Sequence, residues 1–282
     1  MRFACYQIEQ TKGLAIETGR AARGLMETDR GYPGDLDVLV RKGPPALDEA
    51  AKALGAGHPI DLARISRLPP LRAPEKVICV GLNYREHSAE SGFKQPDYPT
   101  LFSRFNSSLI GDGAQIVRPR VSDQLDFEGE LAAVIGKGGR NIPLADALDH
   151  VIGYSIFNDG SIRDYQFKTP QWTMGKNFDD SGGSCPRHRR RVTSRLQGSA
   201  LADPSQWRGG SERFNQRHGV RRATLIAIIS EAITLRSGDV IVTGTTSGVG
   251  LSPKPLFMKA ADTVEVEIER IGILANPIVN AT

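Results

Sequence analysis

The chain has 282 residues, of which 39% are hydrophobic and 24% charged, and this composition is typical of a globular protein with one large domain or one large and one small domain. No apolar stretch approaches the roughly 18 residues of a membrane-spanning helix, and the N-terminus lacks a basic region followed by an apolar run, so we expect neither membrane insertion nor a secretory signal. The net charge of +4 is local: residues 181–222 alone carry +8, so the rest of the chain sums to −4.

The three cysteines, Cys5, Cys79 and Cys185, lie far apart in the sequence. They fit neither a disulfide framework nor a zinc site of the Cys-x-x-Cys type. This pattern favours a reducing compartment, and we expect a cytoplasmic protein.

Residues 1–72 are predicted to form a small N-terminal αβ domain. Arg2–Ile8 and Leu14–Thr18 have the composition of strands, and Leu36–Leu54 is helical in pattern, with a break at the Pro44-Pro45 pair. The proline-rich run over residues 68–74 is typical of a linker, because proline removes the backbone donors of helices and strands.

Residues 73–282 are predicted to form the second, larger domain, which is rich in strands. The pattern over Thr263–Ile271 alternates valine and isoleucine with glutamate, as in a strand with one face in water. Strands outnumber helices, so the predicted fold class is α+β and mostly β. The other predicted strands are Val77–Val80, Phe127–Ile135, Val151–Phe157 and Asp239–Thr243, and the predicted buried helix is Leu225–Thr234.

The segment Ser181–Arg222 is anomalous within this domain. It contains ten arginines, no lysine and only two acids, and nine of its residues are apolar, without a helical or strand period. It is long for a loop inside a compact domain. A solvated basic loop is one interpretation. A nucleic-acid-binding surface is another, which the scarcity of interleaved aromatic residues disfavours, so we expect no nucleic-acid partner.

Two acidic motifs are candidates for a metal site. Glu128 and Glu130 flank Gly129 on a predicted strand, so their side chains point to one face, roughly 7 Å apart. A divalent cation would relieve the repulsion between two such carboxylates. Asp159 ends the next apolar strand and could supply a third carboxylate. Taken alone, each motif is also common on solvated strands and in turns.

Two further stretches could carry catalytic groups. Asn83 and Glu86 have the spacing of a helix N-cap, which would place His87 and Glu90 on one face of a short helix. A carboxylate beside a histidine fixes its tautomer and raises its basicity. Lys176 lies in a glycine- and aromatic-rich stretch and could stabilise an anionic substrate or enolate. An incidental surface pair and a solvated lysine are the alternatives.

The strand-to-turn segment over residues 237–250 is rich in glycine and threonine. Its backbone N–H groups and hydroxyls could bind a carboxylate. It lacks the Gly-x-Ser-x-Gly pattern, which excludes an esterase nucleophile elbow.

Together and in this order, these motifs resemble the fumarylacetoacetate hydrolase family over about residues 76–182 and 225–280. The resemblance implies a mixed β-roll catalytic domain behind a small N-terminal domain, usually in a homodimer. It implies one Mg²⁺ or Mn²⁺ per site held by Glu128, Glu130 and Asp159. It also implies a lid dyad of His87 and Glu90, an active-site lysine at Lys176, and substrate contacts from Arg163, Gln166 and Thr245. The motifs that carry it are Val80–Tyr84, Glu128–Glu130, Phe157–Asp159, Arg163–Gln166, Gly175–Asp179 and Ser237–Thr245.

The activity that this resemblance implies is metal-dependent hydrolysis of a carbon–carbon bond in a small 2,4-diketo acid of the acylpyruvate type. An oxaloacetate-type decarboxylase and a keto–enol isomerase are the alternatives, because all three reactions share an enolate. A family member without catalytic activity is a further rival, which the presence of the three carboxylates, His87, Glu90 and Lys176 argues against. Residues 181–222 depart from the family pattern. We hypothesise two compensating frameshift errors in the gene sequence of this segment. Peptide mapping of Arg187–Arg222 would test this hypothesis.

Overall fold

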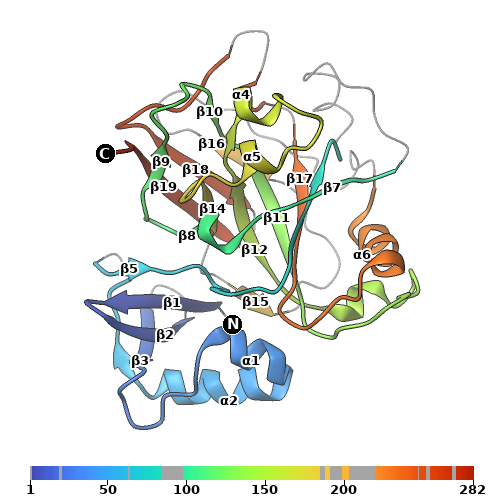
Figure 1. The fold of residues 1–282 in the computed structure, drawn as a ribbon. Coiled ribbons are helices and arrows are strands. Elements are labelled where there is room, and N and C mark those ends of the chain that lie inside the picture. The colour runs from blue at the N-terminus through green and yellow to red at the C-terminus, as the bar shows by residue number, and fades with distance from the viewer. Residues whose placement is uncertain are drawn as a thin grey trace.

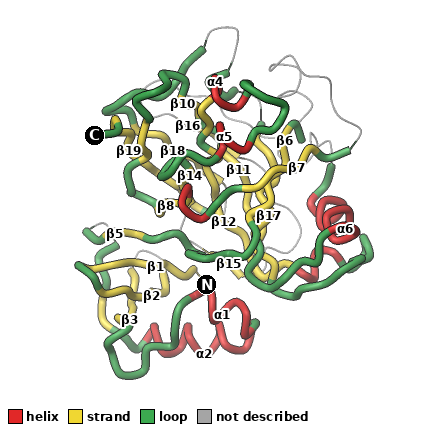
Figure 2. Tube along the Cα trace, viewed as in Figure 1, coloured by secondary structure: helices red, strands yellow, loops and turns green. Residues whose placement is uncertain are grey.

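The computed structural model describes residues 2–18, 21–62, 64–83, 98–184, 188–190, 199–202, 220–246, 248–251, 255–268 and 271–282. Strands dominate these residues, and the longer helices lie at the periphery of the molecule (Figures 1 and 2). The predicted α+β, mostly-β fold class is confirmed.

The N-terminal unit is a β-meander covered by two helices (Figure 1). The predicted helical stretch is divided at Gly43, as the Pro44-Pro45 pair indicated, because proline is favoured at the first turn of a new helix. One strand of the meander was not predicted, since Arg23 and Gly24 interrupt its apolar pattern. The elements are β1 (Arg2–Ile8), β2 (Thr11–Thr18), β3 (Ala21–Met26), α1 (Leu36–Lys42), α2 (Pro44–Gly55), β4 (His58–Pro59) and β5 (Ser66–Arg67).

The centre of the molecule is a curved mixed sheet in which β12, β11, β17, β6 and β7 are neighbours in this order. The pair β11–β12 is an antiparallel hairpin, whereas β17 and β6 pair in parallel. Apart from β7, which is only partly buried, its strands are almost entirely buried, which is why their sequences are rich in apolar residues. The bounds are β6 (Val77–Gly81), β7 (Thr100–Ser103), β11 (Gly129–Ile135), β12 (Val151–Asp159) and β17 (Val240–Thr245).

A second sheet packs across the hairpin. Leu131 and Ile156 of the hairpin contact a cluster that includes Val266 and Leu274 of the second sheet. The predicted alternation is present, because Val264, Val266 and Ile268 are buried while Glu267 is exposed. Its strands, in spatial order, are β16 (Ser199–Ala202), β18 (Thr263–Ile268), β19 (Gly272–Asn280) and β9 (Ile116–Arg118).

Helix α6 (Arg222–Ala232) covers a different part of the central sheet, where Leu225 and Ile229 pack on Ile78 and Ile241. Short elements complete the fold and carry much of the site. They are η1 (Asn106–Ser108), β8 (Leu109–Gly111), β10 (Leu125–Asp126), η2 (Ala147–His150), β13 (Ser161–Ile162), α4 (Arg163–Gln166), α5 (Thr173–Lys176), β14 (Gly182–Ser184) and β15 (His188–Arg190).

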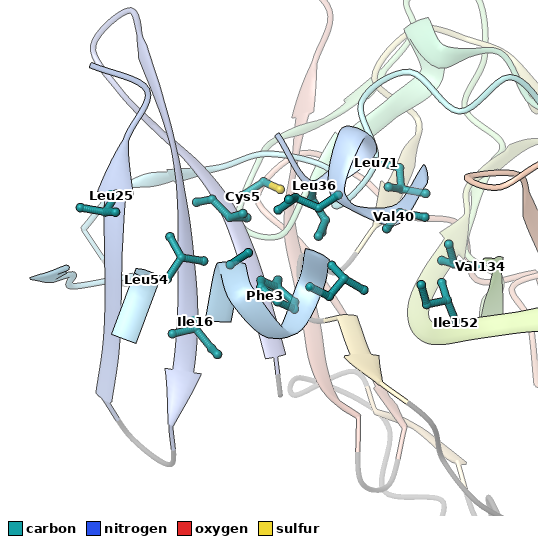
Figure 3. Close-up of a cluster of buried hydrophobic side chains, with 14 residues drawn as sticks. Phe3, Cys5, Ile16, Leu25, Leu36, Val40, Leu54, Leu71, Val134 and Ile152 are labelled. Atoms are coloured by element: carbon teal, nitrogen blue, oxygen red, sulfur yellow. The ribbon is translucent and has the colours of Figure 1, made fainter. Parts of the chain in front are cut away.

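The N-terminal helices and the central sheet share one apolar cluster. Phe3, Leu36 and Val40 pack with Val134 of β11 and Ile152 of β12, and Figure 3 shows these last two side chains facing the helices. The main sheet also continues into the N-terminal unit through the pairing of β15 with β1 and β12. The division of the chain into domains at residue 72 stays a prediction.

The arginine-rich segment contains three of the strands just described. Ser181–Arg222 shows no strand period, and its interpretation as a solvated basic loop does not hold for the residues that form these strands. The reason is length: β14, β15 and β16 have three or four residues each, too few to show an alternation. Strand β14 pairs with both β12 and β8, so at least Gly182–Ser184 belongs to the central sheet. The hypothesis of compensating frame errors stays a prediction.

Candidate metal centre

The three candidate metal ligands meet at the open end of the β11–β12 hairpin, opposite the connection between the two strands. Asp159 is the last residue of β12, and its backbone N–H donates to the carbonyl of Glu128, 2.8 Å away, just before β11 begins. Glu130 is the second residue of β11. All three side chains are buried, and one ligand oxygen from each lies within 4.8 Å of the others. Strand pairing therefore creates the cluster.

Each carboxylate is also held by a donor from a different part of the chain. Glu128 Oε1 accepts from Arg163 Nη2 at 2.6 Å, and Glu130 Oε2 accepts from the Gly244 backbone N–H at 2.6 Å. Asp159 Oδ1 accepts from Arg104 Nη1, also at 2.6 Å. These charge-assisted hydrogen bonds fix the orientation of the three acids.

Lys176 ends the short helix α5 and points into the cluster. Its Nζ is 2.6 Å from Glu128 Oε2 and 2.8 Å from Asp159 Oδ2, and its side chain is 1% exposed. Burial acts to lower the pKa of Lys176, but the charges of Asp159 and Glu128 outweigh it and the pKa is raised. Lys176 is therefore a buried, protonated ammonium group that can donate to an anion.

Glu130 shows that the cluster carries an excess of negative charge. Burial raises its pKa well above the ordinary value, and the charges of Asp159 and Glu128 raise it further, while Lys176 and the Gly244 N–H offset only part of this shift. A divalent cation would remove the excess, and an all-carboxylate set suits hard cations such as Mg²⁺ and Mn²⁺. The residues present thus fit the predicted metal.

A cavity opens directly onto the cluster. Glu128, Glu130 and Lys176 line it together with Thr245, Gln166 and Trp172. Thr245 Oγ1 is buried and has no hydrogen-bond partner among the described residues, so it is a polar atom available to a bound molecule. The predicted substrate-binding residues Gln166 and Thr245 are therefore both placed at the cavity.

Arg163 also lines the cavity, but its guanidinium is taken up by protein acceptors. It donates to Asp126, Glu128 and Gln166 at 2.6–2.8 Å and is 2% exposed. Asp126 is completely buried, and it also accepts from the backbone N–H groups of Gly250 and Leu251. Arg163 thus orients Glu128, and its predicted contact with substrate stays a prediction.

The predicted lid dyad, His87 and Glu90, lies outside the described residues. Asn83, the predicted N-cap, lies just before that segment and is 3% exposed. Its side-chain amide donates to the Thr243 carbonyl at 2.8 Å and its oxygen accepts from the Val220 N–H at 2.9 Å. The Asn83 side chain therefore connects β17 to the approach to α6.

Sequence reasoning missed Arg104 and Asp126. Arg104 follows β7, a short strand that is half polar in sequence and only partly buried, and Asp126 lies two residues before Glu128. A charged residue directly before the predicted strand Phe127–Ile135 is a signal that could have drawn attention to Asp126, whereas β7 offered no such signal for Arg104. Neither residue's partner was visible, because Asp159 is 55 residues from Arg104 and Arg163 is 37 residues from Asp126.

A family model for the C-terminal domain of fumarylacetoacetate (FAA) hydrolase matches residues 76–279. The chain belongs to this family. It is 38% identical over 280 residues to the mitochondrial oxaloacetate tautomerase fahd2 of Xenopus laevis, covering 95% of this chain and 85% of the relative. It is 36% identical over 280 residues to the mitochondrial oxaloacetate tautomerase FAHD2A of Homo sapiens, covering 94% and 87%.

Solved structures in the family share the whole fold. A 5-carboxymethyl-2-hydroxymuconate delta-isomerase from Mycobacterium smegmatis has a TM-score of 0.77 at 28% identity, with 100% of both chains covered. A fumarylacetoacetate hydrolase from Exiguobacterium antarcticum has a TM-score of 0.77 at 27% identity, also with 100% of both chains covered. The predicted family and its β-roll fold are confirmed. Among the described residues, none of the helices has the length and apolarity needed to cross a membrane.

Proposed function

We propose that this enzyme interconverts the keto and enol forms of a small 2-keto dicarboxylic acid of the oxaloacetate type. The observation that carries the proposal is the position of Lys176, which lines the same cavity as Glu128 and Glu130 and whose buried ammonium group also contacts Asp159. Relatives that are 36–38% identical over almost the whole chain are oxaloacetate tautomerases, which favours isomerisation over the hydrolysis expected from the motifs.

The side chains have distinct roles in this proposal. A divalent cation held by Glu128, Glu130 and Asp159 would supply Lewis acidity that favours the enolate form. Lys176 donates a hydrogen bond to the developing enolate oxygen in a site that excludes water, where such a bond is strong. Thr245 Oγ1 and the Gln166 side chain orient the substrate in the cavity.

Keto–enol exchange also needs a group that moves a proton between carbon and solvent. We assign this role to His87, oriented by Glu90, because a histidine paired with a carboxylate is a general base near neutral pH. The assignment rests on the sequence motif. In hydrolysis, the same pair would instead activate a water molecule.

Hydrolysis of an acylpyruvate is the second candidate function. The likeness to the Exiguobacterium antarcticum hydrolase favours it, together with the His87 and Glu90 motif. Decarboxylation of oxaloacetate is the third reaction that an enolate-stabilising site could support. The three reactions give different products and can be separated in one set of assays.

The first test is the conversion of enol-oxaloacetate to the keto form, followed by loss of the enol absorbance with Mg²⁺, with Mn²⁺ and with EDTA. We expect metal-dependent acceleration that Glu130→Gln lowers by at least about a hundredfold, since one ligand of the cation is weakened. Glu267→Gln, on an exposed position of β18, is the matched control and should retain full activity.

Product analysis decides between the candidates. If the enzyme leaves the rate of enol decay unchanged but forms pyruvate from oxaloacetate, the proposed tautomerase would be replaced by a decarboxylase. If the enzyme does not accelerate enol decay but cleaves acetylpyruvate, and His87→Ala abolishes this cleavage, the proposed tautomerase would be replaced by the hydrolase.

Assembly and location complete the proposal. We propose a homodimer, which light scattering coupled to size-exclusion chromatography would test. The relatives' names place them in mitochondria, so a cytoplasmic location stays a prediction for this chain. The absence of nucleic-acid and membrane partners is likewise a prediction.

A further inference from the structure

Arg104 is a completely buried arginine beside the metal centre. It directly follows β7, and its side chain has no solvent exposure. Its Nη1 donates to Asp159 Oδ1 at 2.6 Å and to the Gly160 carbonyl at 3.0 Å. Burial of a charged arginine costs free energy unless its N–H donors are satisfied. We therefore ask what Arg104 contributes to the structure or function of the site.

Two serines hold the other side of the guanidinium. Arg104 Nε donates to Ser108 Oγ at 3.1 Å, and Nη2 donates to Ser181 Oγ at 2.7 Å. Each serine hydroxyl in turn donates to a backbone carbonyl three residues earlier, at 2.7 Å for Ser108 and 2.6 Å for Ser181. The planar guanidinium is therefore fixed in one orientation, which a flexible ammonium group would not be.

This orientation decides how Asp159 can bind a cation. Oδ1 is occupied by Arg104, whereas Oδ2 faces Lys176 and the acid cluster. A carboxylate oxygen has two lone pairs, so Oδ2 can accept from Lys176 and still bind a metal. Chelation through both oxygens would require the carboxylate to rotate until Oδ1 also faced the cluster, and the fixed guanidinium of Arg104 holds Oδ1 in its present position.

We propose that Arg104 is a positioning residue that restricts Asp159 to one metal-binding oxygen and so makes the centre select small octahedral cations over Ca²⁺. Mg²⁺ and Mn²⁺ need about six ligands in octahedral geometry, whereas Ca²⁺ takes about six to eight oxygens and often a bidentate carboxylate. The inference rests on the metal centre of the proposed function. It concerns cation selection and holds whichever reaction follows.

The test measures metal binding without substrate. Mn²⁺ is titrated into metal-free protein and the free ion is followed by electron paramagnetic resonance, and Ca²⁺ is then used to displace the bound Mn²⁺. The readout is the ratio of the Ca²⁺ to the Mn²⁺ dissociation constant. We expect Arg104→Met to lower this ratio by at least about tenfold, the smallest usual effect of removing a partner that orients a metal ligand.

Two further variants keep the test decisive. Arg104→Lys retains the charge but cannot hold Asp159 and both serines together, so we expect an intermediate ratio, and this variant serves if Arg104→Met does not fold. Arg67→Met is the matched control, because Arg67 is a largely buried arginine paired with Asp112 away from the cluster, and its ratio should equal that of the wild type.

A ratio that is unchanged in both Arg104 variants, or lowered equally in Arg67→Met, would overturn the role of Arg104. Failure of the proposed tautomerase activity is a separate result, since Mn²⁺ binding can persist without it. Absence of Mn²⁺ binding to the wild-type protein would overturn the metal centre and this inference together.

Discussion

Lys176 offsets only part of the negative charge of the carboxylates around it. The ammonium group contacts two of the three acids, and Glu130 is the acid with which it forms no hydrogen bond in the structure. Glu130 instead receives one backbone N–H, from Gly244, and its pKa is raised by burial and by the charges of its two neighbours. Protons and metal ions should therefore compete at this residue.

This competition predicts the pH dependence of stability. Because the pKa of Glu130 is raised in the folded protein, the folded state binds more protons than the unfolded state once the pH exceeds the ordinary value of 4.5. The metal-free protein should lose stability as the pH rises from there through the raised pKa. We expect Mg²⁺ to increase the melting temperature more at pH 8 than at pH 5.5, as measured by differential scanning calorimetry.

The same comparison in Glu130→Gln supplies the control. Glutamine does not titrate, so the extra stabilisation by Mg²⁺ at the higher pH should shrink. An equal Mg²⁺ effect at both pH values in the wild-type protein would show that Glu130 does not bind protons in competition with the metal.

The sequence indicated the three acids and Lys176 but not the groups that hold them in place. Glu128, Glu130 and Asp159 lie at the ends of apolar strands, and strand alternation and termination are local properties. Arg104, Gly244 and Asp126 act across 37 to 124 residues, through contacts that only the folded chain creates. Local patterns therefore predicted the ligands better than their supports.

Among the elements, α4 and α5 contribute most to the site for their size. Each has four residues, far too few to form a stable helix alone, so their positions come from packing. Gly175 of α5 lies against Gln166 of α4, where an added Cβ would come within 2.3 Å of the Gln166 backbone nitrogen. This close approach places Lys176 at the acids.

Gly175→Ala should therefore displace α5. Because the clash is with backbone atoms, it cannot be relieved by a side-chain rotation, and we expect activity to fall by at least about tenfold with a loss of about 1–3 kcal/mol of stability. Gly55→Ala is the matched control, since its Cβ would meet open space at the end of α2. Enol decay assays and urea unfolding measure both effects, and near-wild-type activity in Gly175→Ala would contradict this account.

Most of the longer elements were predictable, with β3 and β19 as exceptions, and the short ones were not. The hairpin strands, β18 and the divided helix over residues 36–55 have enough residues to show their periods. No local period marks α4, α5 or β14, which have three or four residues each.

For the whole molecule, the apolar cluster shared by the N-terminal unit and the central sheet has a mechanical consequence. Leu36 is 1% exposed and belongs to the cluster that includes Val134 and Ile152. A continuous core of this kind couples the two parts, so we expect a single cooperative unfolding transition.

Leu36→Ala tests this coupling. Loss of a buried leucine in a close-packed core costs about 2–5 kcal/mol, and the whole transition should shift to lower urea concentration. Leu144→Ala, at a position that is 57% exposed, should have little effect. Two separate transitions, with only the first displaced by Leu36→Ala, would show that the N-terminal unit unfolds independently. Mn²⁺ affinity should stay unchanged in both variants.

The β11–β12 hairpin also bears on how the chain folds. Ile135 pairs with Val151, so the hairpin closes over residues 136–150, whereas the parallel pairing of β17 with β6 joins Val240 to Val77 and must close a far longer loop. We therefore expect the hairpin to bring the three acids together before β17 and β6 pair. Lys176 follows Asp159 by only 17 residues. Lys176 thus supplies a positive charge close in sequence to the three acids, and the hairpin can form before a metal ion binds.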